Sequence, residues 1–116
     1  MKTRYYNMVM SVVTDLTDLT EQQILYGKRT REVVDARWLC VRLMSELGMY
    51  TRQIAGFMRM SMRAVQYILM DFDARIKFGD AMLNIYLVQA RKRVEVLRNE
   101  NEGEAQNKGS PDEVYS

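Results

Sequence analysis

Apolar side chains recur along most of the chain at intervals of three and four residues, the spacing that places them on one face of an α-helix. Strand-like alternation is weak, and the only proline, at position 111, lies in a polar C-terminal segment. The pattern therefore predicts an all-α fold in the form of a small helical bundle. We expect helices over about residues 2–15, 20–26, 30–47 and 80–97, with a further pair of short helices between residues 51 and 76.

Several helix boundaries are marked by residues that satisfy the free backbone groups at helix ends. Thr20 and Gln23 have the spacing of a capping box, in which each side chain bonds the backbone amide of the other residue. Gly27 follows soon after and is a natural C-terminal stop. Thr51 and Ser61 are the expected N-caps of the two short helices. Hydroxyls and amides at helix starts also meet phosphates in DNA complexes, so both residues are candidate backbone contacts.

The two short helices have the spacing of a helix-turn-helix. Ala55 provides the small residue that two helices need where they approach at a steep angle, and Arg59-Met60 makes a short turn. Val65 is placed to lock the second helix onto the first. Small bundles also contain two short helices with an alanine at their crossing, so a purely structural helix pair is the alternative.

The second of these helices has an exposed face without the Glu and Lys residues that are typical of a structural helix. In the standard docking, the N-terminal part of this helix enters the major groove of DNA. Arg63 can then donate two hydrogen bonds to a guanine edge, and Gln66 can pair with adenine. Met62 and Tyr67 are placed to contact a sugar or a thymine methyl group.

Charge is distributed unevenly, although the net charge is only +2. Between residues 28 and 63, eight basic side chains face three acidic ones, and a local positive field of this kind suits a polyanion. The basic run from Lys28 to Arg31 stands at a helix N-terminus, where positive charge opposes the helix dipole and a phosphate is the obvious ligand. A solvated, salt-bridged surface is the alternative explanation.

Residues from about Val9 to Phe72 resemble the C-terminal DNA-binding domain of the bacterial replication initiator DnaA. The similar stretch begins with VVTDLTDLTEQQILYGKRTREVVDARWLCVRLMSEL and continues into YTRQIAGFMRMSMRAVQYIL. The family has a short helix ending in a basic loop, a long helix that begins with an R-x-x-x-x-A-R type run, and then a helix-turn-helix. The spacing Ile54-Ala55, then Ser61 to Val65, is also that of response-regulator and sigma-factor helix-turn-helices.

The resemblance implies a Trp-repressor-like helical fold that binds double-stranded DNA sequence-specifically. No ATPase domain accompanies it in this sequence, so the implied role is a transcription regulator or an accessory replication-initiation factor. It places Arg29, and next Arg31, in the minor groove, and Arg37 on the sugar–phosphate backbone. The family has an Asp-His-Thr signature where this chain has Ser61-Met62-Arg63, so we expect a different target sequence. The residues predicted to contact DNA are Lys28, Arg29, Arg31, Arg37, Thr51, Arg52, Ser61, Met62, Arg63, Gln66 and Tyr67.

Chemistry other than binding finds little support in the residues. The chain has no histidine and a single cysteine, Cys40, whose apolar neighbours indicate a small core residue rather than a nucleophile. The sequence shows no metal cluster, catalytic triad or phosphate-cradling glycine loop. We therefore expect no enzyme activity, cofactor, metal or small-molecule substrate. No signal peptide or membrane-length apolar stretch is visible, so we expect a cytoplasmic, nucleoid-associated protein without a membrane partner.

The last predicted helix, over residues 80–97, carries a heptad-like apolar seam. This seam is expected either to pack on the core of its own domain or to form a homodimer interface. Residues 99–116 contain five acidic residues against Lys108 and are expected to be a disordered acidic tail, which leaves residues 1–98 as one helix-turn-helix domain. The alternative function is a helical protein-interaction adaptor that uses this helix and the tail. The seam consists of Leu83, Leu87, Ala90, Val94 and Leu97.

Overall fold

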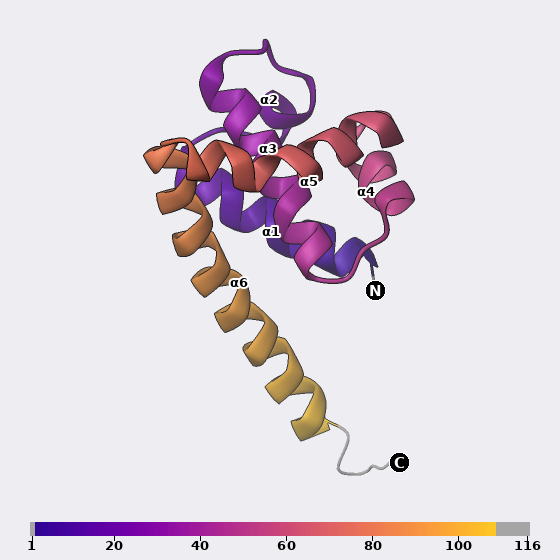
Figure 1. Cartoon of the computed structure of the whole chain (residues 1–116). Helices are drawn as coiled ribbons and strands as arrows, with labels where there is room; N and C mark the ends of the chain where they lie inside the picture. The colour runs from indigo at the N-terminus through magenta and orange to yellow at the C-terminus, as the bar shows by residue number, and fades with distance from the viewer. Residues whose placement is uncertain (1, 109–116) are drawn as a thin grey trace.

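Helices succeed one another in the expected order along the described part of the chain (Figure 1). The computed structural model describes residues 2–108, and the side chains of residues 2–101. Within these residues there is no β-strand, so the prediction of an all-α bundle is confirmed. The helices are α1 (Lys2–Thr17), α2 (Glu21–Tyr26), α3 (Arg31–Glu46), α4 (Thr51–Met58), α5 (Met62–Lys77) and α6 (Ala81–Lys108).

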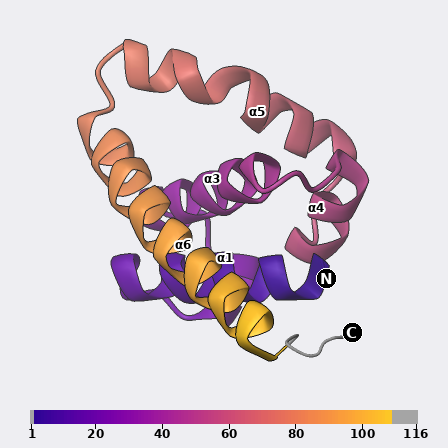
Figure 2. The same ribbon diagram turned by 90° about the horizontal axis from the view of Figure 1, so that it is seen from below.

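The central element of the bundle is α3, which packs against each of the other five helices. Figure 2 shows it between α1 and α5, with α6 crossing α1. Leu39, Val41 and Met44 of α3 are all fully buried, although the helical repeat points them in different directions. A helix that is apolar on several sides is stable only when it is surrounded, and this explains why α3 occupies the middle of the fold.

Two of the three predicted N-caps are confirmed. The Thr20 hydroxyl accepts from the Gln23 amide at 3.1 Å, and the Gln23 side chain accepts from the Thr20 amide at 2.8 Å. The Ser61 hydroxyl caps α5 by accepting from the Ala64 amide at 3.0 Å. The prediction for Thr51 is wrong, because Tyr50 occupies the N-cap position of α4 and its amide donates to the side chain of Gln53 at 2.9 Å.

The apolar seam of α6 belongs to the core of its own chain. Leu83, Leu87, Ala90 and Val94 are buried, and α6 packs against α1, α3 and α5. The structure therefore selects the first of the two roles expected for this seam. A homodimer through residues 80–97 would have to use the opposite, outer face of the helix.

The C-terminal helix is longer than its apolar pattern predicts. α6 continues to Lys108, so the first part of the segment predicted to be disordered is helical, and that prediction is wrong for residues 99–108. The apolar stripe ends at Leu97, and the residues that follow are polar but include the good helix formers Glu, Gln and Ala. Residues 109–116, the rest of the predicted tail, lie outside the described part of the chain.

Candidate nucleic-acid interface

The helix-turn-helix expected from the sequence is formed by α4, a three-residue turn and α5. Ala55 and Val65 are both buried where the two helices meet, as their spacing predicts. The Met60 amide donates to the Ala55 carbonyl at 3.1 Å and closes the turn. Ser61 then caps α5, so the turn ends where the sequence places it.

Arg59 stands at the C-cap of α4 with φ 59° and ψ 43°, the left-handed conformation. Glycine is the usual residue in this position at a helix C-terminus, and for other residues this conformation costs about 1–2 kcal/mol. The sequence pattern predicts for Arg59 only a place in a short turn. The structure shows an exposed arginine held at a strained position of the motif.

The face of α5 that was predicted to read bases points into solvent. Met62, Arg63, Gln66 and Tyr67 are exposed in the first half of the helix, while Val65, Ile68 and Phe72 are buried beneath them. The Tyr67 ring meets the Trp38 ring edge-on, with centroids 6.0 Å apart. The N-terminal half of α5 is thus packed on the core along one face and exposed to solvent along the other. A helix that inserts into a DNA groove needs both.

A groove of about 460 Å³ lies between the α2–α3 loop and the helix-turn-helix. Arg29, Arg37 and Trp38 line it on one side, and Arg59, Met60 and Tyr67 line it on the other. Among the residues that the structure describes, no acidic side chain lines this groove. The fold therefore brings the basic loop and the helix-turn-helix, which are some thirty residues apart in sequence, to one positive surface.

A second groove adjoins the first along α4. Arg52, Gln53, Gly56 and Arg59 line it, so Arg59 belongs to both grooves. Glu21 also lines this second groove, and its carboxylate accepts a hydrogen bond from the Tyr6 hydroxyl at 2.5 Å. Because Arg59 is shared, the basic surface continues from the loop over the turn to the start of α4.

Arg37 has a structural role that the sequence pattern does not predict. Its Nε donates to the Ile24 carbonyl at 2.5 Å and its Nη2 donates to the Gly27 carbonyl at 3.0 Å. These bonds tie the C-terminal end of α2 to α3. Burial lowers the pKa of the Arg37 guanidinium, and the charge of Arg29 lowers it further. Arg37 therefore stabilises the fold by joining α2 to α3, and it also adds positive charge to the lining of the groove.

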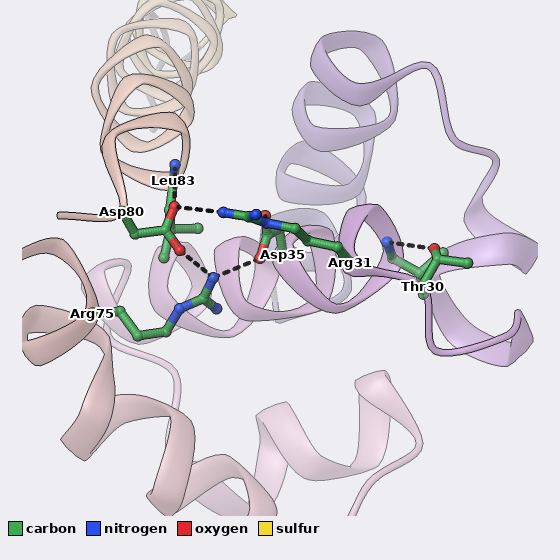
Figure 3. A network of polar contacts seen from close by, with 7 residues as sticks. Thr30, Arg31, Asp35, Arg75, Asp80 and Leu83 are labelled. Atoms are coloured by element: carbon green, nitrogen blue, oxygen red, sulfur yellow. Dashed lines mark hydrogen bonds and ion pairs between the residues drawn. The ribbon is translucent and has the colours of Figure 1, made fainter. Parts of the chain in front are cut away.

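Arg31 does not join the groove. Its side chain extends toward the start of α6, with its nitrogens 3.9 Å from a carboxylate oxygen of Asp35 and 3.7 Å from one of Asp80 (Figure 3). The side chain is 73% exposed, but it lies with these acids rather than with Arg29. The structure thus separates the two arginines that the resemblance placed in the minor groove, and only Arg29 lines the groove.

The network in Figure 3 explains how this region is held. Nη2 of Arg75, near the end of α5, donates to Asp35 at 2.8 Å and also to Asp80. Asp35 is the only charged residue among the described ones that is buried, and the sequence pattern does not predict its burial because it falls beside the apolar stripe of α3. The Arg75 guanidinium carbon also lies 4.6 Å from the centre of the Trp38 ring.

The ion pairs among the described residues are confined to one region of the molecule. Each ion pair that joins residues 2–101 involves α3, the C-terminal half of α5 or α6. By contrast, five exposed basic residues around the helix-turn-helix and the loop make no ion pair with any described residue. Within the basic stretch between residues 28 and 63, Arg31 and Arg42 do form salt bridges, so the alternative of a salt-bridged surface holds for part of the stretch and not for these five residues. These residues are Lys28, Arg29, Arg52, Arg59 and Arg63.

Other kinds of site are not apparent in the described part of the chain. Among the side chains of residues 2–101, no group of three or more His, Cys, Asp and Glu residues is placed to hold a metal ion. No helix within residues 2–108 is long and apolar enough to cross a membrane. Cys40 is fully buried, and burial raises the pKa of its thiol far above the ordinary value. A buried, protonated thiol is a packing group rather than a nucleophile.

Comparison with known proteins identified no relative of this chain. No family model, no curated protein and no solved structure matches the chain.

Proposed function

We propose that the chain binds double-stranded DNA sequence-specifically, with the N-terminal half of α5 in the major groove. The observation that carries this proposal is the cluster of exposed, unpaired basic residues around the helix-turn-helix and the basic loop. Unpaired positive charge gathered on one surface costs stability through mutual repulsion and is compensated when a polyanion binds. Between residues 47 and 70 the sequence has three arginines and no acidic residue, which favours the same ligand.

Base reading is assigned to the exposed side chains of α5. Arg63 has the length and the paired donors to bind a guanine edge, and Gln66, one turn later on the same face, suits adenine. Met62 and Tyr67 flank them and provide apolar and ring surface for sugars and thymine methyl groups. This division leaves Lys28 and Arg52 as backbone contacts, which position the protein without reading sequence.

The resemblance to the DNA-binding domain of the initiator DnaA supports a role for the basic loop. Arg29 extends the surface beyond α5 and is assigned to the adjacent minor groove, where an arginine is favoured by the narrow, negative cleft of A·T-rich DNA. With Ser61-Met62-Arg63 at the start of the recognition helix, the target differs from the origin box. The role proposed is a transcription regulator or an accessory replication-initiation factor associated with the nucleoid.

Binding is tested by fluorescence anisotropy with labelled duplexes across a salt series. Six to ten phosphate contacts predict a loss of roughly 10³–10⁵ in affinity between about 50 and 200 mM salt. Selection from random duplexes then gives the target sequence. A chain that fails to bind any duplex at low salt would not be a DNA-binding protein, and the proposal would be abandoned.

The outer face of α6 favours a second candidate, a protein-interaction adaptor. Met82, Ile85, Val88 and Val96 are all about half exposed on this helix, opposite the buried seam, and a second copy of the chain is the simplest partner for such a face. Light scattering over a range of protein concentrations tests self-association. If the chain were a monomer at every concentration and bound duplex DNA tightly, self-association would be rejected and only the DNA-binding function would remain.

A further inference from the structure

The geometry of duplex DNA indicates what the first groove of the candidate interface would hold. Any major groove and the minor groove beside it are separated by one sugar–phosphate strand. If α5 occupies the major groove and Arg29 reaches the minor groove, that strand must pass between them. On this protein the space between α5 and the α2–α3 loop is the groove lined by Arg29, Arg37, Trp38, Arg59, Met60 and Tyr67.

We infer that this groove seats one sugar–phosphate strand of the duplex, with Arg59 as its principal phosphate ligand. The inference rests on the proposed function and gives the groove a ligand of defined chemistry, a phosphodiester. Three guanidinium groups surround the groove, and none of its described lining residues is acidic. The groove therefore complements the negative charge of a phosphate.

The partners of the three arginines distinguish their roles. Nε and Nη2 of Arg37 already donate to backbone carbonyls at the C-terminal end of α2. Arg37 therefore contributes mainly its positive charge to the groove. Arg29 is assigned to the minor groove. Arg59 is exposed and makes no hydrogen bond or ion pair through its side chain with any described residue, so its full set of donors remains for the ligand.

The backbone of Arg59 supports the same assignment. Its left-handed conformation would suit glycine better than any other residue. What arginine adds at this position is its guanidinium group, on a residue that lines both grooves. A residue that strains the backbone while facing a ligand-sized groove is the kind of outlier that marks a functional contact.

The rings of Trp38 and Tyr67 complete the site. They meet edge-on at the side of the groove and offer apolar surface for the deoxyribose that accompanies each phosphate. Trp38 is the only tryptophan of the chain, so all tryptophan fluorescence comes from a residue that lines this groove.

The first experiment measures how affinity depends on salt in the variant Arg59→Gly. Loss of one phosphate contact should lower the slope of log affinity against log salt by about 0.9, and should weaken binding roughly 5- to 10-fold near 0.1 M salt, equally for every sequence. Lys92→Gln, which removes one exposed charge on α6 away from both grooves, serves as the matched control and should leave the slope unchanged. Arg59→Asn, whose new residue also tolerates the left-handed region, should repeat the result.

The second experiment measures quenching of Trp38 by acrylamide, a neutral quencher that DNA does not repel. Saturating duplex should lower the quenching constant, because the strand covers the groove. Duplex binding with unchanged Trp38 quenching, or an unchanged salt slope in both Arg59 variants, would overturn the groove assignment and leave the proposed function standing. No duplex binding by the unaltered chain would overturn the function itself.

Discussion

The guanidinium group of Arg75 lies over the face of Trp38, with its central carbon 4.6 Å from the ring centre, while Nη2 of the same residue bonds the buried Asp35. This one side chain joins the C-terminal half of α5 to α3, and it does so behind the ring that Tyr67 meets from the groove side. The orientation of α5 is thus fixed from within the fold by a residue near its C-terminal end, away from the exposed N-terminal face that is proposed to bind DNA.

Removing Arg75 should destabilise the fold strongly. Arg75→Leu leaves the Asp35 carboxylate buried without its closest partner, and breaking a buried pair in this way costs roughly 3–5 kcal/mol. Because Arg31 stays within 3.9 Å of Asp35 and Arg75 itself is 23% exposed, we expect the lower part of that range. Urea unfolding measures the loss.

The double variant Asp35→Leu with Arg75→Leu is the control for this prediction. It removes both charges, so much of the stability lost in Arg75→Leu should return. If the double variant were less stable than Arg75→Leu alone, the unpaired carboxylate would not be the source of the loss.

Acid should weaken the fold through Asp80 and Glu46. Burial would raise the pKa of each carboxyl group, but hydrogen bonds and charges from Arg75 at Asp80, and from Arg91 and Arg42 at Glu46, outweigh it and lower both pKa values. A carboxyl group whose pKa is lower in the folded state contributes stability that is fully present above its unfolded-state pKa of about 4. That contribution is lost as the pH falls through the lower, folded-state value.

Asp80→Asn and Glu46→Gln should therefore reduce the dependence of the unfolding free energy on pH below about pH 4. Urea titrations at a series of acidic pH values measure this slope. A variant with the same slope as the unaltered chain would show that its carboxyl group is not linked to folding.

Gly56→Ala should stabilise the protein. Gly56 lies within α4 and is exposed, and a Cβ atom built there meets no described heavy atom within 4 Å. Replacing a glycine inside a helix by alanine then gains about 0.5–1 kcal/mol. Thermal unfolding measures the shift in Tm.

Gly27 provides the opposite case for comparison. A Cβ atom at Gly27 would lie 2.4 Å from the carbonyl oxygen of Gln23, so Gly27→Ala must displace backbone and should lower the Tm. Equal effects of the two alanine substitutions would contradict the packing described for α2 and α4.

Arg63→Ala should change sequence preference as well as affinity. At the preferred site the loss should be about 1–3 kcal/mol, because the proposed bidentate contact to one base would be removed. Competition between the preferred duplex and single-base variants measures the effect. Arg52→Ala is the matched control, since a backbone contact should weaken all duplexes alike; an equal loss on every duplex for Arg63→Ala would assign that residue to the backbone too.

The sequence predicted those features that depend on neighbouring residues. The caps at Thr20 and Ser61, the burial of Ala55 and Val65, and the order of the helices all follow from local spacing. The misplaced cap at Thr51 shows the limit of this reasoning, because a hydroxyl favours the N-cap position but the side chain of Gln53 decided where the helix begins. The extension of α6 was missed because periodicity carries no signal in a helix without an apolar stripe.

The candidate interface was predictable in composition but not in arrangement. All five unpaired basic residues belong to the positive segment seen in the sequence, and four of them were in the predicted set. Which arginines stay free depends on partners far along the chain: Arg31 lies near Asp80, and Arg37 bonds the end of α2. Arg59 was left out because a short turn gives no indication of which grooves its side chain will line.

The central position of α3 has a consequence for how the protein unfolds. Since each of the other helices packs on α3, separating any one of them exposes part of the same core, so the body of the domain should open as a single cooperative unit. Native-state hydrogen exchange should find the slowest amides in α3, with protection equal to the global stability. A ligand that binds only the folded state, as DNA is proposed to do, would then slow those amides too, including those of α3 residues that do not line the groove.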